Sequence, residues 1–347
     1  MKYIVRWFRS QAALITAIIG LAFFASAVHA TTHEFYKGKM IRIIVGFSPG
    51  GGFDTYTRFI ARHLSKHIPG NPTIIIENKT GAGSLVAANY TYKAAKPDGL
   101  TIGNFIGTLF VQQLFGNPAV KFDAVKFKYI GVPVQDNFML GISPRTGVKS
   151  IEEWFNSKKV IKFGGLSPGT PQDDVPKILK ATIGLPVRIV SGYKGTAAVK
   201  LAFNGGEVDG VVNSWESFKA TWRKEVESGD LIIVLQNIPK RHPDLPNVPV
   251  AMEFAKTEEA RKIIRARLHT LGPTLRPYVL PPGTPQDRVE ILRKAFRATI
   301  ADPEFLAESK RAKLDIDPLS GAELESNVRE VFNLEPSFVT KLKGILK

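Results

Sequence analysis

The sequence of 347 residues has an ordinary globular composition, with 44% hydrophobic and 22% charged residues, which excludes a disordered or fibrous protein. It contains no cysteine, which excludes a lipid anchor on cysteine, thiol catalysis and a zinc site built from cysteine. The formal net charge is +16, but the basic residues are spread along the chain without a run of five. We therefore expect a mild attraction for anions and no binding to nucleic acid.

Residues 1–30 have the pattern of a secretory signal peptide. Lys2, Arg6 and Arg9 form a positive start, a largely apolar run follows, and small residues end the segment at Ala30. We predict cleavage after Ala30, with Ala27 as a second choice, and export to the periplasm. An uncleaved membrane anchor is the alternative, although the apolar run is shorter than a span of about 20 residues. Removing the segment takes away three basic and no acidic residues and leaves a net charge of +13.

The first part of the mature chain alternates strand-like and helix-like segments. β-branched runs predict strands over 40–45, 73–77 and 100–105. Apolar residues three and four apart predict helices over 55–67 and 85–95. This alternation is typical of parallel strands with right-handed crossovers.

A second, similar series begins near Phe138. The expected strands are 139–142, 160–163, 187–190, 208–212 and 231–235. The expected helices are 150–156, with Ser150 and Glu153 spaced as a capping box, then one from 171 to about 183, and 197–204.

The last third of the chain is expected to be mainly helical. A proline-rich stretch at 242–249 precedes helices over 286–300, from 302, and over 321–346. We predict an α/β protein with two lobes joined by a hinge and a ligand cleft between them. The expected division is 31–135 for the first part of lobe 1, 136–240 for lobe 2, and 241–347 for the return to lobe 1.

A Gly-x-Ser-Pro-Gly motif ends one strand in each half, at Ser48 and Ser167. Gly-x-Ser-x-Gly is also the nucleophile elbow of α/β-hydrolases, in which the residue after the serine donates its N–H to the oxyanion hole. Pro49 and Pro168 have no N–H to donate, and losing one such donor costs about 3 kcal/mol of transition-state stabilisation. An exported serine hydrolase is therefore a disfavoured alternative. We expect no enzymatic activity, no cofactor and no metal.

Three glycine-rich turns that precede expected helices are the candidate ligand-binding segments, at 48–54, 167–170 and 193–196. The first turn of a helix has free N–H groups and a positive dipole end, which bind carboxylates. In open α/β sheets, ligands bind beyond the carboxyl ends of the strands. The alternative for each turn is a structural connection in which the polar residue is only a helix cap.

The predicted ligand contacts combine these turns with residues that follow other strands. They are Phe47, Ser48, Pro49, Gly50, Gly51, Gly52, Phe53, Asp54, Gly107, Thr108, Ser167, Gly169, Thr170, Tyr193, Lys194, Gly195, Thr196, Asn213, Trp215 and Glu216. Ser48, Asp54 and Thr170 are equally compatible with helix caps, and Lys194 with a solvated charge. Trp215 is a core residue or part of the cleft wall, and its polar neighbours favour the cleft.

The order of five motifs resembles the periplasmic substrate-binding proteins of tripartite tricarboxylate transporters, the Bug or TctC-type receptors. The motifs are IIVGFSPGGGFD at 43–54, IENKTGAG at 76–83, PDGLT at 97–101, GYKGT at 192–196 with GEVD at 206–209, and PPGTP at 281–285. Together they cover essentially the whole mature chain.

The resemblance implies a type II periplasmic-binding-protein fold. It also implies that the turns at 48–54 and 193–196 hold a ligand carboxylate, largely through backbone amides and water, with help from 165–171. The expected partners are a small organic carboxylate and the membrane subunits of a tripartite transporter, and the protein is expected to be a monomer. A ligand sensor for a signalling partner is the alternative role. Phe53 and the segment 213–216 depart from the family pattern, so citrate-like acids, aromatic carboxylates and amino acids all stay open as ligands.

Overall fold

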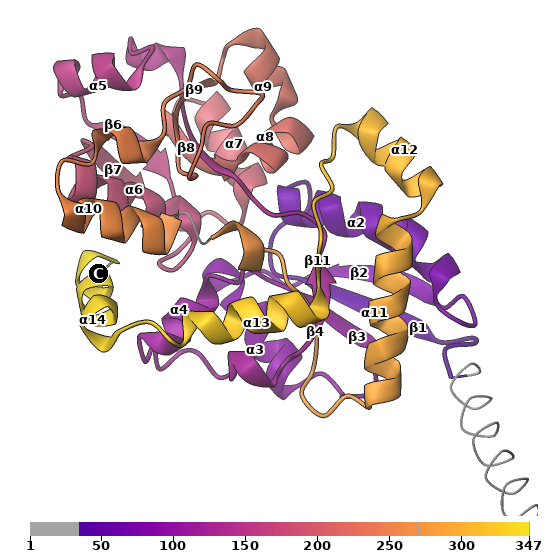
Figure 1. Ribbon diagram of the computed structural model, residues 1–347. Helices are drawn as coiled ribbons and strands as arrows, with labels where there is room; N and C mark the ends of the chain where they lie inside the picture. The colour runs from indigo at the N-terminus through magenta and orange to yellow at the C-terminus, as the bar shows by residue number, and fades with distance from the viewer. Residues whose placement is uncertain (1–34, 269–270, 347) are drawn as a thin grey trace, which may run out of the picture.

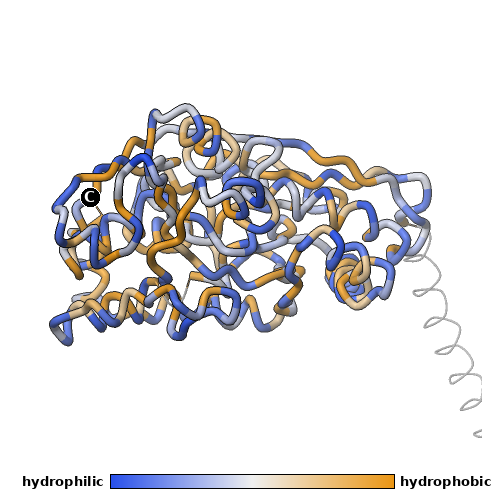
Figure 2. Tube along the Cα trace, turned by 90° about the horizontal axis from the view of Figure 1, so that it is seen from above, coloured by the Kyte–Doolittle hydropathy of each residue, from blue (hydrophilic) through white to orange (hydrophobic). Residues whose placement is uncertain are grey.

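The computed structural model describes residues 35–268 and 271–346, which form two α/β lobes (Figure 1). The predicted signal peptide lies outside these residues. Hydrophobic and hydrophilic residues alternate along many of the helices (Figure 2), as expected for helices that pack one face on a sheet. Within the described part of the chain, none of the helices combines the length and the apolar character of a membrane span.

Lobe 1 is built on a sheet that, in the described residues, has the order β11-β4-β10-β3-β1-β2. Its strands are β1 (Met40–Val45), β2 (Thr73–Asn78), β3 (Thr101–Asn104), β4 (Lys128–Val132), β10 (Tyr278–Leu280) and β11 (Leu319–Ser320). β1 lies between β2 and β3 and is parallel to both, which confirms the predicted parallel arrangement. β10 returns from late in the chain and inserts antiparallel between β3 and β4.

Alternation along β1 sends its side chains to two helical layers. Ile41 and Ile43 pack in one cluster with Phe59, whereas Ile44 packs in another with Ala88. The first layer contains α2 (Gly52–Leu64), α11 (Gln286–Ile300) and α12 (Pro303–Ala312). The second contains α3 (Leu85–Lys93), α4 (Leu109–Leu114) and α13 (Gly321–Val331).

Lobe 2 is built on a sheet of order β7-β6-β8-β5-β9. Its strands are β5 (Phe138–Ile142), β6 (Ile161–Gly164), β7 (Val187–Val190), β8 (Gly210–Ser214) and β9 (Ile232–Gln236). Its helices are α5 (Ile151–Ser157), α6 (Pro171–Ile183), α7 (Thr196–Asn204), α8 (Trp215–Thr221), α9 (Arg223–Ser228) and α10 (Glu258–Ile263). α6 covers β6, β7 and β8, and α10 packs on α6.

The late part of the chain is shared between the lobes. The chain leaves lobe 1 at 133–137 and re-enters it through 271–277, just before β10. α13 then packs on β4 of lobe 1, but α14 (Pro336–Leu346) packs on α6 of lobe 2. The sequence-based division assigned all of 241–347 to lobe 1, whereas α10 and α14 contact lobe 2. The segment 321–346, expected to close the chain helically, forms α13 and α14, and Pro336 begins the second of them.

Gly107 lies at a point where a side chain does not fit. Its N–H donates to Leu275 O at 2.9 Å, and an added β-carbon would lie 1.8 Å from the carbonyl oxygen of Thr274. Because that oxygen belongs to the backbone of the connection between the lobes, Gly107→Ala must displace the connection. We expect the substitution to lower the free energy of unfolding by about 1–3 kcal/mol.

Gly344→Ala in α14 is the matched control for this prediction. Its added β-carbon would have no atom within 4 Å, and alanine favours a helix over glycine by about 1 kcal/mol. Urea denaturation followed by circular dichroism compares the two variants. An unfolding midpoint of Gly107→Ala equal to that of the wild type would contradict the expected clash.

Candidate functional site in the cleft between the lobes

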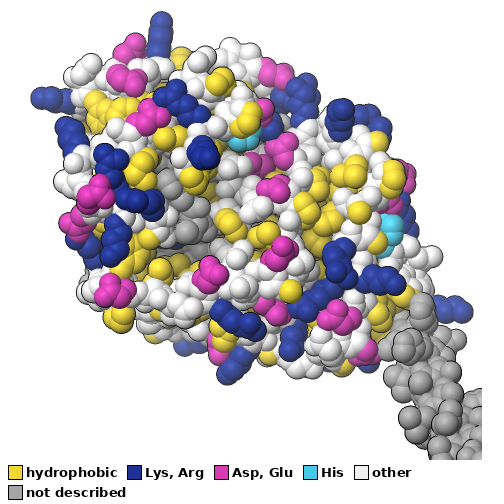
Figure 3. Space-filling model, in the orientation of Figure 1, with side chains coloured by type: hydrophobic (Ala, Val, Ile, Leu, Met, Phe, Trp, Pro, Cys, Tyr) yellow, Lys and Arg dark blue, Asp and Glu magenta, His cyan; other side chains and the backbone are white. Residues whose placement is uncertain are grey.

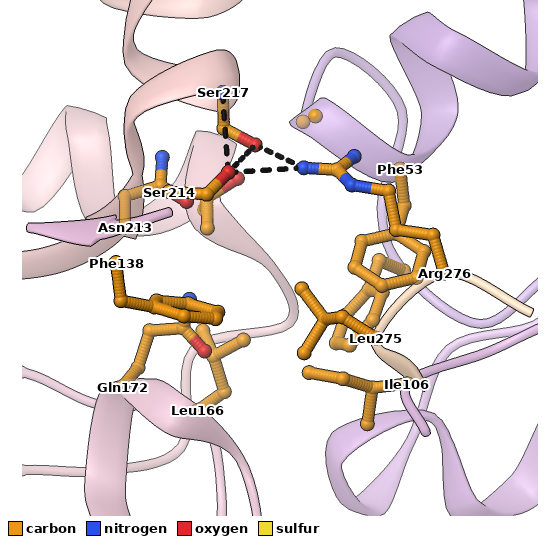
Figure 4. A pocket seen from close by; sticks show the side chains of 14 residues that line it. Phe53, Ile106, Phe138, Leu166, Gln172, Asn213, Ser214, Ser217, Leu275 and Arg276 are labelled. Atoms are coloured by element: carbon orange, nitrogen blue, oxygen red, sulfur yellow. Dashed lines mark hydrogen bonds between the residues drawn. The ribbon is translucent and has the colours of Figure 1, made fainter. Parts of the chain in front are cut away.

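A small cavity lies between the lobes, at the start of α2 (Figure 4). Lobe 1 and the second connection contribute Phe47, Gly51, Gly52, Phe53, Ile106, Leu275 and Arg276. Lobe 2 contributes Phe138, Leu166, Gln172, Thr196, Asn213, Ser214 and Ser217. The polar side chains of Arg276, Ser214 and Ser217 meet at one end, and Ile106, Leu166 and Leu275 lie at the other.

The lobes contact each other directly around this cavity. Ser48 N donates to Lys194 O at 3.2 Å, and Thr108 Oγ1 donates to Gly169 O. The cavity has a volume of about 20 Å³, which is close to the space that one water molecule needs. The cleft is therefore closed, and an organic acid can enter only if the lobes separate.

Two helix N-termini face the cavity without a side-chain cap. Gly51 and Gly195 are the N-cap residues of α2 and α7, and neither provides a capping side chain. The next residues, Gly52 and Thr196, line the cavity. Their helices therefore present free N–H groups and positive dipole ends to the cleft, as the glycine-rich turns predicted.

Asp54 holds the first of these turns in shape and lies outside the cavity lining. Its carboxylate accepts hydrogen bonds of 2.9 Å from Gly50 N, Arg58 Nε and Asn78 Nδ2. Burial opposes ionisation of Asp54, but the hydrogen bonds from Arg58, Gly50 and Asn78 outweigh it and lower the pKa of this carboxyl group. Asp54 thus holds the loop before α2 in place. The N-cap of α2 is Gly51, so Asp54 is not the helix cap that was the alternative interpretation of this residue.

The remaining predicted residues of lobe 1 surround the cavity at different depths. Phe47 and Phe53 line it, and their rings contact each other at a tilt of 53° with centroids 4.8 Å apart. Pro49 and Gly50 are exposed and lie outside the cavity lining. Ser48 Oγ is buried and has no hydrogen-bond partner in the described structure.

Some residues of the predicted turns of lobe 2 line the cavity, and others contact lobe 1 beside it. Ser167 and Thr170 pack against Gly83 of lobe 1, and Gly169 N donates to Asp174. Thr196 lines the cavity, while Tyr193 Oη donates to Glu207 and lies outside the lining. The remaining two, Lys194 and Gly195, contact lobe 1 through backbone at Ser48, and the Lys194 side chain is exposed.

Trp215 and Glu216 begin α8 behind the cavity wall. Trp215 Nε1 donates to Asp244 at 2.8 Å, and the ring is buried. Glu216 accepts hydrogen bonds from Asn137 N and Nδ2 at 3.0 and 2.8 Å. Burial, followed by the negative charge of Asp136, raises the pKa of Glu216 to about 7. Glu216 therefore contacts the first connection between the lobes, whereas Asn213 lines the cavity.

Arg276 is the main cavity residue that the sequence analysis missed. It lies in the second connection and pairs with Asp136 of the first, with Nε–Oδ2 and Nη2–Oδ1 distances of 2.7 and 2.6 Å. Its guanidinium also lies 4.9 and 4.8 Å from the ring centroids of Phe53 and Tyr56. Burial opposes its charge, but Asp136 outweighs burial and raises the pKa of Arg276. The sequence signal was a single arginine in the otherwise uncharged segment 271–280.

Charge on the molecular surface does not form one basic patch on the face shown in Figure 3. Lys and Arg side chains are scattered around this face, and Asp and Glu side chains lie among them. Several pairs make ion pairs, such as Arg241 with Glu253 and Lys219 with Asp244. Among the described residues that line the cavity, the charged side chain is the buried Arg276.

Comparisons with known proteins agree with this architecture. A family model described as the tripartite tricarboxylate transporter family receptor matches residues 57–329. A UPF0065 protein in the gbd 5′ region of Cupriavidus necator is 27% identical over 98% of this chain and 97% of its own length.

Solved structures show the same fold. The periplasmic binding protein BugD has a TM-score of 0.72 and 22% identity, covering 89% of this chain and 98% of that chain. The structure of R. palustris Rpa4515 with adipate has a TM-score of 0.71 and 18% identity, and the match covers 89% of this chain and 97% of that chain. The two-lobed chain therefore has the type II periplasmic-binding-protein fold that its motifs predicted.

Proposed function

Because the chain belongs to the family of tripartite tricarboxylate transporter receptors, we propose that it is a periplasmic receptor that closes over a small organic carboxylate and delivers it to a tripartite transporter. In this role the ligand stabilises the closed lobes through contacts that the open form cannot make, which shifts the population towards the closed form. The membrane subunits then recognise that form.

The observation that carries the proposal is the closed cleft, where two uncapped helix N-termini meet buried polar groups. α2 and α7 approach from opposite lobes, and Gly51 lies against Thr196. Gln172, Asn213 and Arg276 line the cavity, and each has a buried polar atom without a hydrogen-bond partner in the described residues. Buried polar groups are rarely left unpaired. A carboxylate provides acceptors for Asn213 Nδ2 and Arg276 Nη1, whereas Gln172 Oε1 accepts from a donor on the ligand or from water.

The finer assignments follow the same proposal. We place the signal peptide at 1–30 with cleavage after Ala30, and the mature protein in the periplasm as a monomer. Contacts in the structure support extending lobe 2 to about residue 268 and adding α14 to it. The turns at 48–54, 167–170 and 193–196 are proposed as ligand contacts, made directly or through water.

Ligand binding by the purified mature protein is the first test of this function. We expect at least one organic acid in a panel of mono-, di- and tricarboxylates, aromatic acids and amino acids to raise the unfolding temperature. A ligand at 100 times its dissociation constant adds about 2.7 kcal/mol to stability. Differential scanning fluorimetry measures the shift, and a panel without any stabilising acid would reject the proposal.

A closure-blocking variant provides the control. A β-carbon on Gly52 would lie 2.2 Å from Ser217 Oγ across the cleft, so Gly52→Val should hinder closure. We expect roughly tenfold weaker binding of the same acid. Delivery is tested by uptake of the labelled acid in cells that lack this protein. Unchanged uptake with loss of a transcriptional response would favour the signalling role instead.

A further inference from the structure

The wall of the cleft beside the hinge contains a buried cation with one unused nitrogen. Arg276 is 2% exposed, and its Nε and Nη2 donate to Asp136. Nη2 also donates to Ser217 and Ser214 at 2.6 and 3.2 Å (Figure 4). Nη1 has no acceptor within the described structure. Because leaving a buried charged donor unpaired is costly, Nη1 marks a position where an acceptor from outside the chain fits.

Nη1 lies at the start of α2. A β-carbon on Gly52, the first residue of this 13-residue helix, would be 3.4 Å from Nη1. The positive end of α2 and the guanidinium therefore act at one position, and both favour an anion there. Asp136 holds the guanidinium by its other edge, so that Nη1 is left for the ligand.

Asn213 is a second unpaired donor that lines the same cavity. It lies on β8 in lobe 2, the residue is 3% exposed, and its Nδ2 has no hydrogen-bond partner among residues 35–268 and 271–346. The cavity lining therefore offers donors from both lobes. A carboxylate joins them when the lobes close over the ligand, at a wider separation than the one that leaves the present cavity of about 20 Å³.

The end of the cavity between Phe138, Leu166 and Leu275, away from the starts of α2 and α7, does not suit a second anion. Arg276 is the only charged side chain among the described residues that line it. Apolar side chains of Phe138, Leu166 and Leu275 surround its body (Figure 4). Behind Leu166, the first turn of α6 holds the buried carboxylate of Asp173, which accepts a hydrogen bond from Leu166 N, while the neighbouring Asp174 is paired with Arg267. A second ligand carboxylate at this end would be desolvated and repelled.

We propose that Arg276, Asn213 and the start of α2 bind the carboxylate of a monocarboxylic acid, whose apolar body lies between Phe138, Leu166 and Leu275. This inference rests on the proposed function, because it concerns the ligand of the same cleft. It separates the chain from Rpa4515, whose structure contains adipate, a dicarboxylate.

Isothermal titration calorimetry of the purified mature protein with matched acids tests the inference. The pairs are pentanoate with pentanedioate, and benzoate with benzene-1,4-dicarboxylate. We expect each monocarboxylate to bind at least roughly tenfold more tightly than its dicarboxylate, since the second charge must be buried unpaired. Equal or tighter binding of the dicarboxylates would overturn the inference.

Two variants test the residues themselves. Asn213→Asp places a like charge beside the ligand carboxylate, and we expect roughly tenfold or greater loss of monocarboxylate affinity. Because Arg276→Met alone leaves the buried charge of Asp136 unpaired and destabilises the fold, we combine it with Asp136→Leu. We expect this double variant to lose its preference for pentanoate over uncharged pentanamide. Lys240→Met, at an exposed cation of lobe 2, is the control and should bind as the wild type does.

The outcomes distinguish the two proposals. If no organic acid of any class binds to the wild type, the proposed function itself fails. If acids bind, but Asn213→Asp and the double variant keep wild-type affinity and selectivity, the function stands and the assignment to Arg276 and Asn213 is wrong.

Discussion

Replacing Asp136 by alanine is expected to lower the free energy of unfolding by about 3–5 kcal/mol, because it leaves the buried guanidinium of Arg276 without its charged partner. The pair is almost completely buried, with side-chain exposures of 2% and 0%. It joins the two connections at 133–137 and 271–277, so the loss acts on the hinge and on both lobes. Urea denaturation followed by tryptophan fluorescence measures the change.

The double variant Asp136→Leu, Arg276→Met is the control for this prediction. Replacing both charges by apolar groups removes the desolvation cost together with the attraction, so the double variant should be more stable than Asp136→Ala. The Met side chain still packs between Phe53 and Tyr56. If the free energy of unfolding of Asp136→Ala lies within about 1 kcal/mol of the wild-type value, the pair has no structural role.

The stability of the protein is expected to fall by about 3 kcal/mol from pH 4.5 to pH 7 through Glu216 alone. Burial and the charge of Asp136 raise the pKa of Glu216 from 4.5 to about 7 in the folded protein. The folded state therefore holds a proton that the unfolded chain has already released in this range. The stabilisation is complete below pH 4.5 and is lost as the pH rises through 7.

Glu216→Gln removes this titration and keeps a carbonyl acceptor for Asn137. We expect its unfolding free energy to vary less with pH than that of the wild type, when both are measured by chemical denaturation at pH 4.5, 5.5, 6.5 and 7.5. Glu152→Gln, at an exposed position in the first turn of α5, is the control and should follow the wild type. If the unfolding free energies of all three proteins vary with pH in the same way, the pKa of Glu216 is not raised by folding.

Local patterns in the sequence determined much of the fold. The β-branched run at 40–45 and the run at 187–190 coincide with β1 and β7, and the helix expected over 286–300 coincides with α11. Such segments are predictable because their apolar spacing follows the period of the element itself. The motif turns at 51–53 and Thr196 also lie at the cavity, because a strand-to-helix turn in a parallel sheet brings its backbone to the edge where ligands bind.

The composition of the cleft was decided by the tertiary structure. Asp136 and Arg276 are 140 positions apart, and nothing around either residue indicates that they form a buried pair. β10 has only three residues, and it forms a strand because it pairs with β3 on one side and β4 on the other. α10 and α14 pack on α6 because their apolar faces complete a layer that residues 136–240 leave open. These features depend on contacts between distant segments, so no local period indicates them. The sequence alone determined the longer strands and helices and the turns that precede α2 and α7, whereas β4, β10, α4 and α10 emerged only in the tertiary structure.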